Sequence, residues 1–325
     1  NGVMPSHTIF NERPECQDRL IQFLINMGYD YVSRSEAESK RRNLSSVLFE
    51  DELIRFLQRQ TYTYNGHELL FSGESITKAV KELDASLLQG LSMASKEIYH
   101  HLTLGISLEE SIAIDSDIPV KQSFDLHYID FDHPANNIWQ VTEEFSVQRP
   151  NGSYARPDIV LMVNGIPFVV IECKKSSVDV AEGVQQNVRN MMPDYIPQLF
   201  KFAQIVMAIN PQKVLYGTGG TGSDYFVEWR EDDIEWQNEV CKKCSPDGSI
   251  LEQDKVAASM LSKHRLLDLV QNFILFDNNI KKIARHQQYF AINKSMDRIN
   301  GKDGSTSKGG VIWHTQGSGK SLTMV

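Results

Sequence analysis

Two acidic residues and a lysine stand at the ends of two apolar segments near the middle of the 325-residue sequence. Asp158 precedes the first segment, and Glu172 and Lys174 end the second. Facing carboxylates repel each other unless a cation lies between them, and Mg²⁺ prefers oxygen ligands. Lys174 shares a strand face with Glu172, so it could orient or deprotonate a metal-bound water. The spacing predicts Mg²⁺-dependent hydrolysis of a phosphodiester, with Asp158 and Glu172 as metal ligands. A solvated strand end with surface ion pairs is the alternative.

The segments 159–163 and 166–171 flank Asn164-Gly165, a strong signal for a β-hairpin. Each segment is apolar on both faces. We therefore expect two central strands in a sheet that is covered on both sides.

The pairing register decides whether the charged residues meet. A strict two-residue turn would place Asp158 opposite Ile171, with its side chain facing away from Glu172. A shift by one residue would place Asp158 directly opposite Glu172. Pro167 has no backbone N–H to donate to the partner strand, which argues against the strict two-residue register. We therefore predict a three-residue loop at 164–166, or an equivalent bulge.

A second group of residues near the end of the sequence could bind a nucleotide. The run Gly317-Ser318-Gly319-Lys320-Ser321 follows the β-rich segment Val311 to Trp313 and predicts a buried strand that leads into a phosphate-binding loop. Backbone N–H groups and Lys320 would bind phosphates, and the Ser321 hydroxyl would bind Mg²⁺. The usual first glycine of such a loop is replaced by His314.

Gln288 lies about thirty residues before this loop. A glutamine amide both donates and accepts hydrogen bonds, which suits the edge of adenine. We interpret Gln288 as an adenine reader for ATP; a polar helix surface is the alternative.

The first group resembles the PD-(D/E)xK nuclease signature, including Pro157 before Asp158. With the nucleotide segment, the chain resembles the R (restriction) subunit of type I restriction-modification enzymes. The segments that carry this resemblance are Asn164-Gly165-Ile166-Pro167, Ile196–Phe200, Leu266–Leu269, Arg285–Tyr289 and Trp313–Ser321.

The resemblance implies an α/β fold, a restriction-endonuclease-like mixed sheet flanked by helices, followed by the beginning of a RecA-like P-loop domain. It implies cleavage of double-stranded DNA with Mg²⁺, coupled to ATP-driven translocation, in a complex with methyltransferase (M) and specificity (S) subunits. We expect the motor domain to be truncated after the phosphate loop, so the fragment should not be an active ATPase.

Nucleases of this branch commonly carry Gln-x-x-x-Tyr on the helix after the catalytic strand. The expected helix, residues 180–190, offers Gln186 as a candidate catalytic residue, but Asn190 replaces the tyrosine. Tyr195 could substitute only if the chain bends back. The fold often adds an acidic residue from an early helix, and the sequence leaves four candidates open: Glu15, Glu50, Glu52 and Glu97.

The hydrophobic periodicity predicts early helices, then strands around the hairpin. We place an endonuclease domain at 1–258 and the start of the motor domain at 259–325. The predicted helices are 15–27, 48–57, 75–93 and 96–104, and the predicted strands are 124–131, 139–147, 204–209 and 213–216.

The net charge of −9 argues against a general nucleic-acid coat protein, although a local basic track would suffice for a nuclease. Candidate basic segments are Lys174-Lys175, Arg189 and 34–42. No membrane span or signal peptide is evident, so we expect a cytoplasmic protein. Cys241 and Cys244 have metal-ligand spacing, but no second pair is present to complete a zinc site.

Two other readings remain. The nuclease fold could be a non-cleaving module that binds DNA or partner subunits, although such a module could lose Lys174, which is present. A stand-alone helicase is disfavoured because two thirds of the chain precedes the nucleotide segment.

Overall fold

The computed structural model describes residues 15–114, 118–302, 304, 311–312 and 319–324. Its centre is a six-stranded sheet with the order β1-β6-β9-β10-β11-β12. Strands β1 and β6 are parallel, as are β10 and β11, and the other neighbours are antiparallel. The sheet is therefore mixed, as predicted. Its strands are β1 (Asp30–Val32), β6 (Trp139–Glu143), β9 (Ile159–Val163), β10 (Ile166–Cys173), β11 (Ile205–Asn210) and β12 (Lys213–Gly217).

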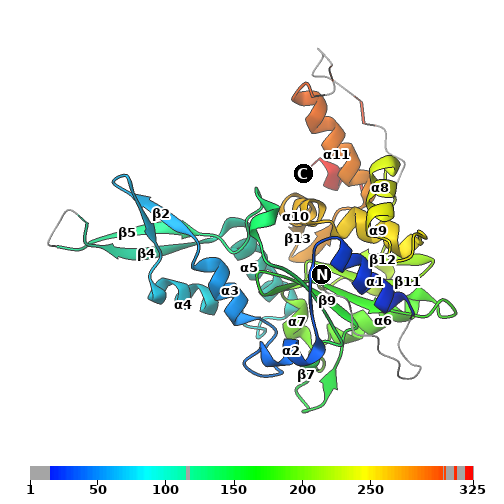
Figure 1. Ribbon diagram of the computed structural model, residues 1–325, viewed down its shortest axis with the longest axis horizontal. Coiled ribbons are helices and arrows are strands. Elements are labelled where there is room, and N and C mark those ends of the chain that lie inside the picture. The colour runs from blue at the N-terminus through cyan, green and yellow to red at the C-terminus, as the bar shows by residue number, and fades with distance from the viewer. Residues whose placement is uncertain (1–14, 115–117, 303, 305–310, 313–318, 325) are drawn as a thin grey trace.

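Helices cover both faces of this sheet (Figure 1). On one face, α1 (Glu15–Asn26) packs against α8 (Ile234–Cys244) and α9 (Glu252–Leu261). On the other, α6 (Val180–Asn190) contacts β10 and β11. Every residue of β9 and β10 is buried, which confirms the prediction of two central strands covered on both sides.

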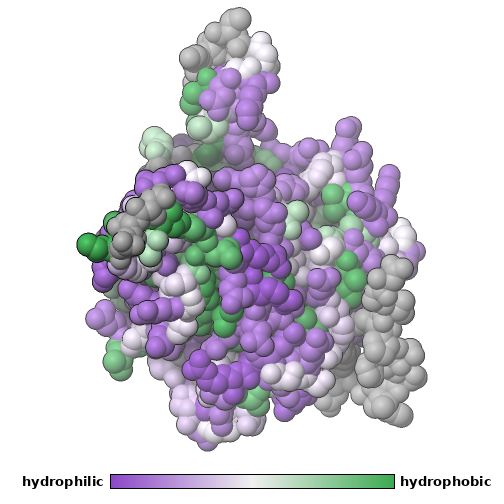
Figure 2. Space-filling model, turned by 60° about the vertical axis from the view of Figure 1, so that its left-hand side comes forward, coloured by the Kyte–Doolittle hydropathy of each residue, from purple (hydrophilic) through white to green (hydrophobic). Residues whose placement is uncertain are grey.

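An arm extends from this body (Figure 1, left). It contains two separate hairpins and the helices beside them. Figure 2 turns this side toward the viewer and shows apolar side chains among hydrophilic ones. The elements are α3 (Glu50–Leu57), β2 (Thr61–Tyr64), β3 (His67–Leu70), α4 (Gly73–Glu82), β4 (Ile106–Ile112) and β5 (Val120–Leu126). Helix α5 (Leu91–Leu104), which precedes β4, packs in the body (Figure 1).

The remaining elements connect or extend the body. Helix α11 projects away from the sheet, with the short α12 beside it (Figure 1). These elements are α2 (Arg34–Ser39), the 3₁₀ helix Pro134–Asn136, β7 (Val147–Gln148), β8 (Tyr154–Ala155), α7 (Pro197–Phe200), the 3₁₀ helix Ser223–Tyr225, α10 (Lys263–Asn272), β13 (Ile274–Asp277), β14 (Ile280–Ile283), α11 (His286–Ile299) and α12 (Lys320–Thr323).

Several predicted elements are confirmed. Helix α1 stops before Gly28, which has a left-handed φ of 100°, and α5 stops before Gly105, where φ is 74°. Glycine tolerates such angles without a Cβ clash. Helix α3 and strands β11 and β12 also lie where we predicted them.

Three predictions were wrong. The single helix 75–93 is two helices, α4 and α5, because the chain turns between them and Gly90 has a φ of 91°. The predicted strand 124–131 ends at Leu126, and its strand β5 pairs with β4 instead of leading into the central sheet. The predicted strand 139–147 breaks at Glu144, whose φ is 47°.

The predicted boundary after residue 258 lies inside α9, which packs against α1 and α10. The division into domains stays a prediction. Within the described part of the chain, no helix is both long and apolar enough to cross a membrane.

Candidate functional site

The hairpin β9–β10 closes with a two-residue turn. Asn164 and Gly165 have left-handed φ angles of 52° and 76°, and Val163 pairs with Ile166. The predicted three-residue loop was therefore wrong.

A β-bulge after the turn changes the register. Pro167 pairs with Met162, but Val169 pairs with Leu161, so Phe168 is the extra residue. The alternative that we predicted, an equivalent bulge, is confirmed. From this point the register continues toward the far end of the hairpin, where it brings Asp158 and Glu172 together.

The two carboxylates meet at the end of the sheet. Asp158 Oδ2 accepts a hydrogen bond of 2.7 Å from the Cys173 backbone N–H. Glu172 is fully buried, and its Oε1 lies 3.4 Å from Asn190 Nδ2. Its Oε2 is buried and has no hydrogen-bond partner among the described residues.

Burial disfavours the charged forms of both carboxylates, and each also feels the negative charge of an acidic neighbour. Burial is the main cause that raises the pKa of Asp158, and the charge of Glu144 adds to it. The pKa of Glu172 is raised well above its usual value, first by burial and then by the charge of Asp158. Lys174 and Arg189 oppose the rise at Glu172 only partly.

A divalent cation fits this arrangement. A buried carboxylate oxygen without a partner is costly, and two adjacent carboxylates gain most from a positive charge between them. Asp158 and Glu172 supply the hard oxygen ligands that Mg²⁺ prefers. The Asp158–Glu172 pair could thus hold such an ion.

Lys174 and Gln186 lie at the same end of the sheet. Lys174 Nζ donates a hydrogen bond of 2.6 Å to Gln186 Oε1 on α6. Gly183 lets α6 pack closely on β11, because a Cβ at that position would lie 3.0 Å from the Ala208 Cβ. The structure therefore brings together all four predicted residues of this site: Asp158, Glu172, Lys174 and Gln186.

Asn190, four residues after Gln186, occupies the position where the nuclease branch commonly has tyrosine. Its side chain is buried and reaches Glu172. The spacing signal was therefore present in the sequence, although the residue type hid it.

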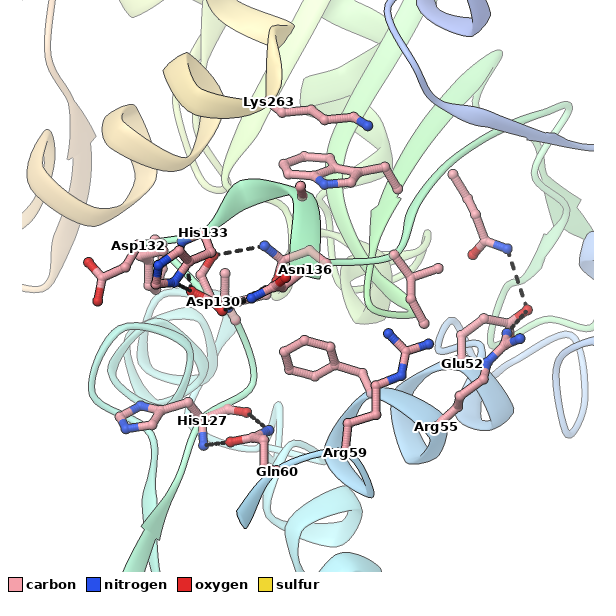
Figure 3. A pocket seen from close by; sticks show the side chains of 18 of the residues that line it. Glu52, Arg55, Arg59, Gln60, His127, Asp130, Asp132, His133, Asn136 and Lys263 are labelled. Atoms are coloured by element: carbon pink, nitrogen blue, oxygen red, sulfur yellow. Dashed lines mark hydrogen bonds and ion pairs between the residues drawn. The ribbon is translucent and has the colours of Figure 1, made fainter. Parts of the chain in front are cut away.

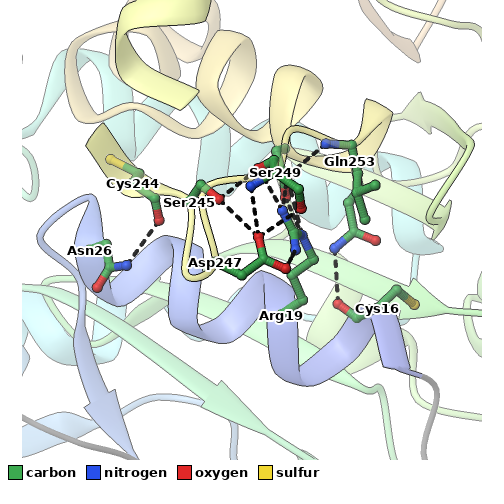
Figure 4. A network of polar contacts seen from close by, with 10 residues as sticks. Cys16, Arg19, Asn26, Cys244, Ser245, Asp247, Ser249 and Gln253 are labelled. Atoms are coloured by element: carbon green, nitrogen blue, oxygen red, sulfur yellow. Dashed lines mark hydrogen bonds and ion pairs between the residues drawn. The ribbon is translucent and has the colours of Figure 1, made fainter. Parts of the chain in front are cut away.

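Helix α1 supports the site from the opposite face of β10. Cys16 Sγ donates to the Lys174 carbonyl at 3.1 Å, and Gln17 Nε2 donates to the Asp158 carbonyl at 3.2 Å. Arg19 fixes α1 to α9 and to the segment before it through ion pairs with Asp254 at 2.7 Å and Asp247 at 2.8 Å (Figure 4). The ion pairs of Arg19 thus hold α1, which contacts the backbone carbonyls of Asp158 and Lys174.

Glu144 is an acidic neighbour that sequence reasoning missed. Its backbone N–H donates to the Asp158 carbonyl at 3.0 Å, and its side chain accepts from Gln17. Its left-handed φ, which places it here, had no sequence signal.

The four early-helix candidates have other surroundings. Glu15 begins α1 and is exposed. Glu50 forms an ion pair with Arg42 and Glu52 with Lys40, and Glu97 Oε1 lies 4.0 Å from His101 Nε2.

The opposite end of the sheet has a polar cavity of about 1060 Å³. Figure 3 shows Lys263, Arg59 and Glu52 among its lining side chains, which come from different elements. It shares no lining residue with the candidate nuclease site.

Cys241 and Cys244 are buried on α8. Among the described residues, no group of three or more histidine, cysteine or acidic side chains has a metal-binding arrangement. Cys173 is buried as well, on the face of β10 that α1 covers.

The nucleotide segment is described only in part. Gln288 is buried; its Oε1 accepts from the Arg285 N–H at 2.8 Å, and its Nε2 donates to the Gly319 carbonyl at 3.0 Å. The proposed adenine reader thus touches the proposed phosphate loop. Lys320 and Ser321 begin α12 and are exposed, while Gly317 and Ser318 lie outside the described residues.

The prediction of a buried strand before this loop was wrong at Val311 and Ile312, the two residues of that segment that the structure describes. Val311 and Ile312 are 90% and 54% exposed and belong to no strand. Trp313 lies outside the described residues.

A mixed sheet with an acidic pair and a nearby lysine at one strand end is the arrangement of the PD-(D/E)xK nuclease class. Residues 9–225 match the family model "Type I restriction enzyme R protein N terminus", and this chain belongs to that family. Residues 287–325 match the SWI2/SNF2 ATPase model.

Two curated relatives are described as endonuclease subunits of type I restriction enzymes. The chain is 28% identical to the putative type I restriction enzyme MjaIXP endonuclease subunit of Methanocaldococcus jannaschii, over 97% of this chain and 31% of the relative. It is 26% identical to the type I restriction enzyme HindI endonuclease subunit of Haemophilus influenzae, over 96% of this chain and 29% of the relative. The chain thus spans about a third of the length of these relatives.

Proposed function

We propose that this chain carries the DNA-cleaving domain of a type I restriction enzyme and the beginning of its ATP-driven motor. The observation that carries this proposal is the meeting of Asp158, Glu172 and Lys174 at one end of the sheet, with a buried, unpartnered oxygen on Glu172. Family membership supports it.

Asp158 and Glu172 would hold Mg²⁺, which when bound supplies charge stabilisation at the phosphodiester and activates water. Lys174 orients the attacking water or takes a proton from it. Gln186 accepts a hydrogen bond from Lys174 Nζ and so fixes its position. The buried Asn190 amide holds Glu172 in place.

ATP would bind to Gln288 and to the loop Gly317-Ser318-Gly319-Lys320-Ser321, with Mg²⁺ on the serine hydroxyl. The match to an ATPase model over residues 287–325 supports this assignment. ATP hydrolysis would drive translocation of double-stranded DNA, in a cytoplasmic complex with the M and S subunits.

The test is cleavage of plasmid DNA by the assembled complex with Mg²⁺ and ATP. We expect Lys174→Ala and Asp158→Ala to lower cleavage by about 10² to 10⁴-fold, while ATP hydrolysis continues. Lys213→Ala is the control, because Lys213 is an exposed lysine that pairs with Glu228 on the edge strand β12. Unchanged cleavage in Lys174→Ala would contradict the proposal and favour a non-cleaving docking module.

A further inference from the structure

Two arginines share one tyrosine ring beside the candidate site. Arg149 follows β7, Arg189 lies in the last turn of α6, and Tyr195 follows that helix. The guanidinium carbons of Arg149 and Arg189 lie 3.9 and 5.4 Å from the centroid of the Tyr195 ring. We call these three residues the arginine–tyrosine cluster.

Backbone contacts hold the cluster in place. Arg149 Nε donates to the Asp194 carbonyl at 3.2 Å, and the Arg149 N–H donates to the Ser153 carbonyl at 2.8 Å. The Tyr195 N–H donates to the Met192 carbonyl at 2.9 Å. The tip of the β7–β8 hairpin is thereby joined to the turn after α6.

Within the described residues, neither Arg149 nor Arg189 forms an ion pair, whereas Arg19, Arg42 and Arg265 each contact a carboxylate. The ring thus holds two positive charges that form no ion pair with the described residues, and a phosphate anion beside them would offset that charge. Arg149 uses Nε for Asp194, so its other N–H groups can form the paired hydrogen bonds that suit a phosphate.

The cluster is connected to both proposed metal ligands. Arg189 precedes Asn190, whose side chain contacts Glu172, and the charge of Arg189 acts on Glu172. The β7–β8 hairpin that carries Arg149 leads directly to Asp158. A DNA strand whose phosphodiester lay at the acidic pair would pass close to the cluster.

We propose that Arg149 and Arg189, held on the Tyr195 ring, bind a backbone phosphate of duplex DNA beside the phosphodiester at Asp158 and Glu172. This inference rests on the proposed function. The phosphate contact would position the DNA strand at the acidic pair. The two arginines would also supply local positive charge in a chain whose net charge is −9.

The test is equilibrium binding of a short labelled DNA duplex to the 325-residue chain, with Ca²⁺ in place of Mg²⁺, over a series of salt concentrations. Each phosphate contact contributes about 0.9 to the slope of log K against log salt. We expect Arg149→Ala and Arg189→Ala each to weaken binding and to reduce that slope by up to this amount. Arg55→Ala is the matched control: it removes the same charge from an exposed arginine at the opposite end of the sheet.

A second pair of variants tests the role of the ring. Tyr195→Phe keeps the aromatic face and should bind like the wild type, whereas Tyr195→Leu should lose affinity as the arginines lose their support. Because Arg189 also acts on Glu172, Arg149→Ala is the decisive arginine variant.

A slope unchanged in Arg149→Ala, an equal loss in Arg55→Ala, or an absence of binding to the duplex at low salt would overturn the inference. None of these results depends on cleavage, which the Lys174→Ala test measures separately. Loss of slope together with full cleavage by Lys174→Ala would retain the phosphate contact and reject the proposed chemistry.

Discussion

Two hairpins of this molecule close with the same two residues and differ in what they build. Asn65-Gly66 joins β2 and β3 in the arm, and Asn164-Gly165 joins β9 and β10 in the central sheet. All four residues have left-handed φ angles, between 47° and 78°. The same local turn chemistry therefore operates in both places.

The difference begins beyond the turns. The hairpin β2–β3 keeps one register from Tyr64 opposite His67 to Thr61 opposite Leu70. In β9–β10 the bulge at Phe168 shifts the register.

The turn residues also differ in burial. Asn65 is exposed, whereas Asn164 is buried, donates to the Tyr128 carbonyl at 2.9 Å and accepts from the Ile138 N–H at 2.7 Å. The turn alone does not bring the acidic residues of the candidate site together; the bulge and the packing around it do so.

The largest contrast should come from the two glycines. A Cβ on Gly165 would lie 2.2 Å from the Phe49 carbonyl oxygen, while a Cβ on Gly66 would meet nothing within 4 Å. Gly66→Ala should cost only the left-handed penalty of about 1–2 kcal/mol, and Gly165→Ala should cost about 4 kcal/mol or more. Denaturant unfolding measures both. Equal losses would show that the packing around the central turn contributes nothing.

The third hairpin, β13–β14, sharpens the comparison because a buried lysine follows its Asn278-Asn279 turn. Lys281 Nζ donates to the Gln204 Oε1 at 2.8 Å and to Ser95, both neutral groups, and burial lowers its pKa from 10.5 to about 7.

The folded chain therefore loses the Lys281 proton near pH 7, while the unfolded chain keeps it to about pH 10. Between these values the unfolded state binds more protons, so the free energy of unfolding should rise with pH. The difference between wild type and Lys281→Met should change by about 1.4 kcal/mol per pH unit, or about 3 kcal/mol from pH 7 to 9. A difference that is constant over this interval would show that the lysine stays charged.

Two buried glutamates near opposite ends of the same sheet should respond oppositely to loss of charge. Glu52 pairs with Lys40 at 2.6 Å, so Glu52→Gln should cost about 1–3 kcal/mol. Glu172 faces Asp158, so Glu172→Gln should leave the metal-free stability unchanged or raise it. Thermal unfolding without divalent ions tests both, and a large loss in Glu172→Gln would contradict the assignment of Glu172 as an uncompensated charge.

A pH series extends this test without mutation. The folded-state pKa values of Asp158 and Glu172 are raised, so their protonated forms favour the folded state at low pH, and this contribution is lost as pH rises through those values. Stabilisation by Mg²⁺ should therefore grow with pH, because protons compete for the same oxygens. Stabilisation that fell as pH rose would argue against binding by this pair.

The smallest effect expected is at Asn190. Its hydrogen bond of 3.4 Å to Glu172 orients a proposed metal ligand, and loss of such support typically lowers metal affinity by about 10-fold or more. Asn190→Ala should therefore weaken Mg²⁺ binding by at least about 10-fold, measured by calorimetry. Asn65→Ala, in the exposed turn of the arm, is the control and should bind Mg²⁺ as the wild type does.

The central hairpin could be predicted because its two segments are apolar at every position, a pattern that requires cover on both faces. The pairing register of the hairpin could be narrowed in two ways: Pro167 has no backbone N–H for the strict two-residue register, and only a shifted register would bring Asp158 opposite Glu172. The sequence did not show that Phe168 would be the extra residue, because a bulge inside a uniformly apolar strand leaves no mark in the periodicity.

Features that join distant segments were not predictable. Arg149, which follows β7, meets Tyr195, which follows α6, and Gln17 reaches the Asp158 carbonyl from α1. Asn190 was dismissed because it is not tyrosine, although its spacing from Gln186 was correct. Side-chain type is a weak guide where only position and a hydrogen-bond donor are needed.

The most direct test of the central claim, that the bulge-aligned pair Asp158 and Glu172 holds a divalent cation, is a calorimetric titration of Mg²⁺ into the chain and into Asp158→Asn. The account predicts saturable binding by the wild type and by Glu52→Gln, with loss of that binding in Asp158→Asn. Equal binding by the wild type and Asp158→Asn, or no binding by either, would contradict it.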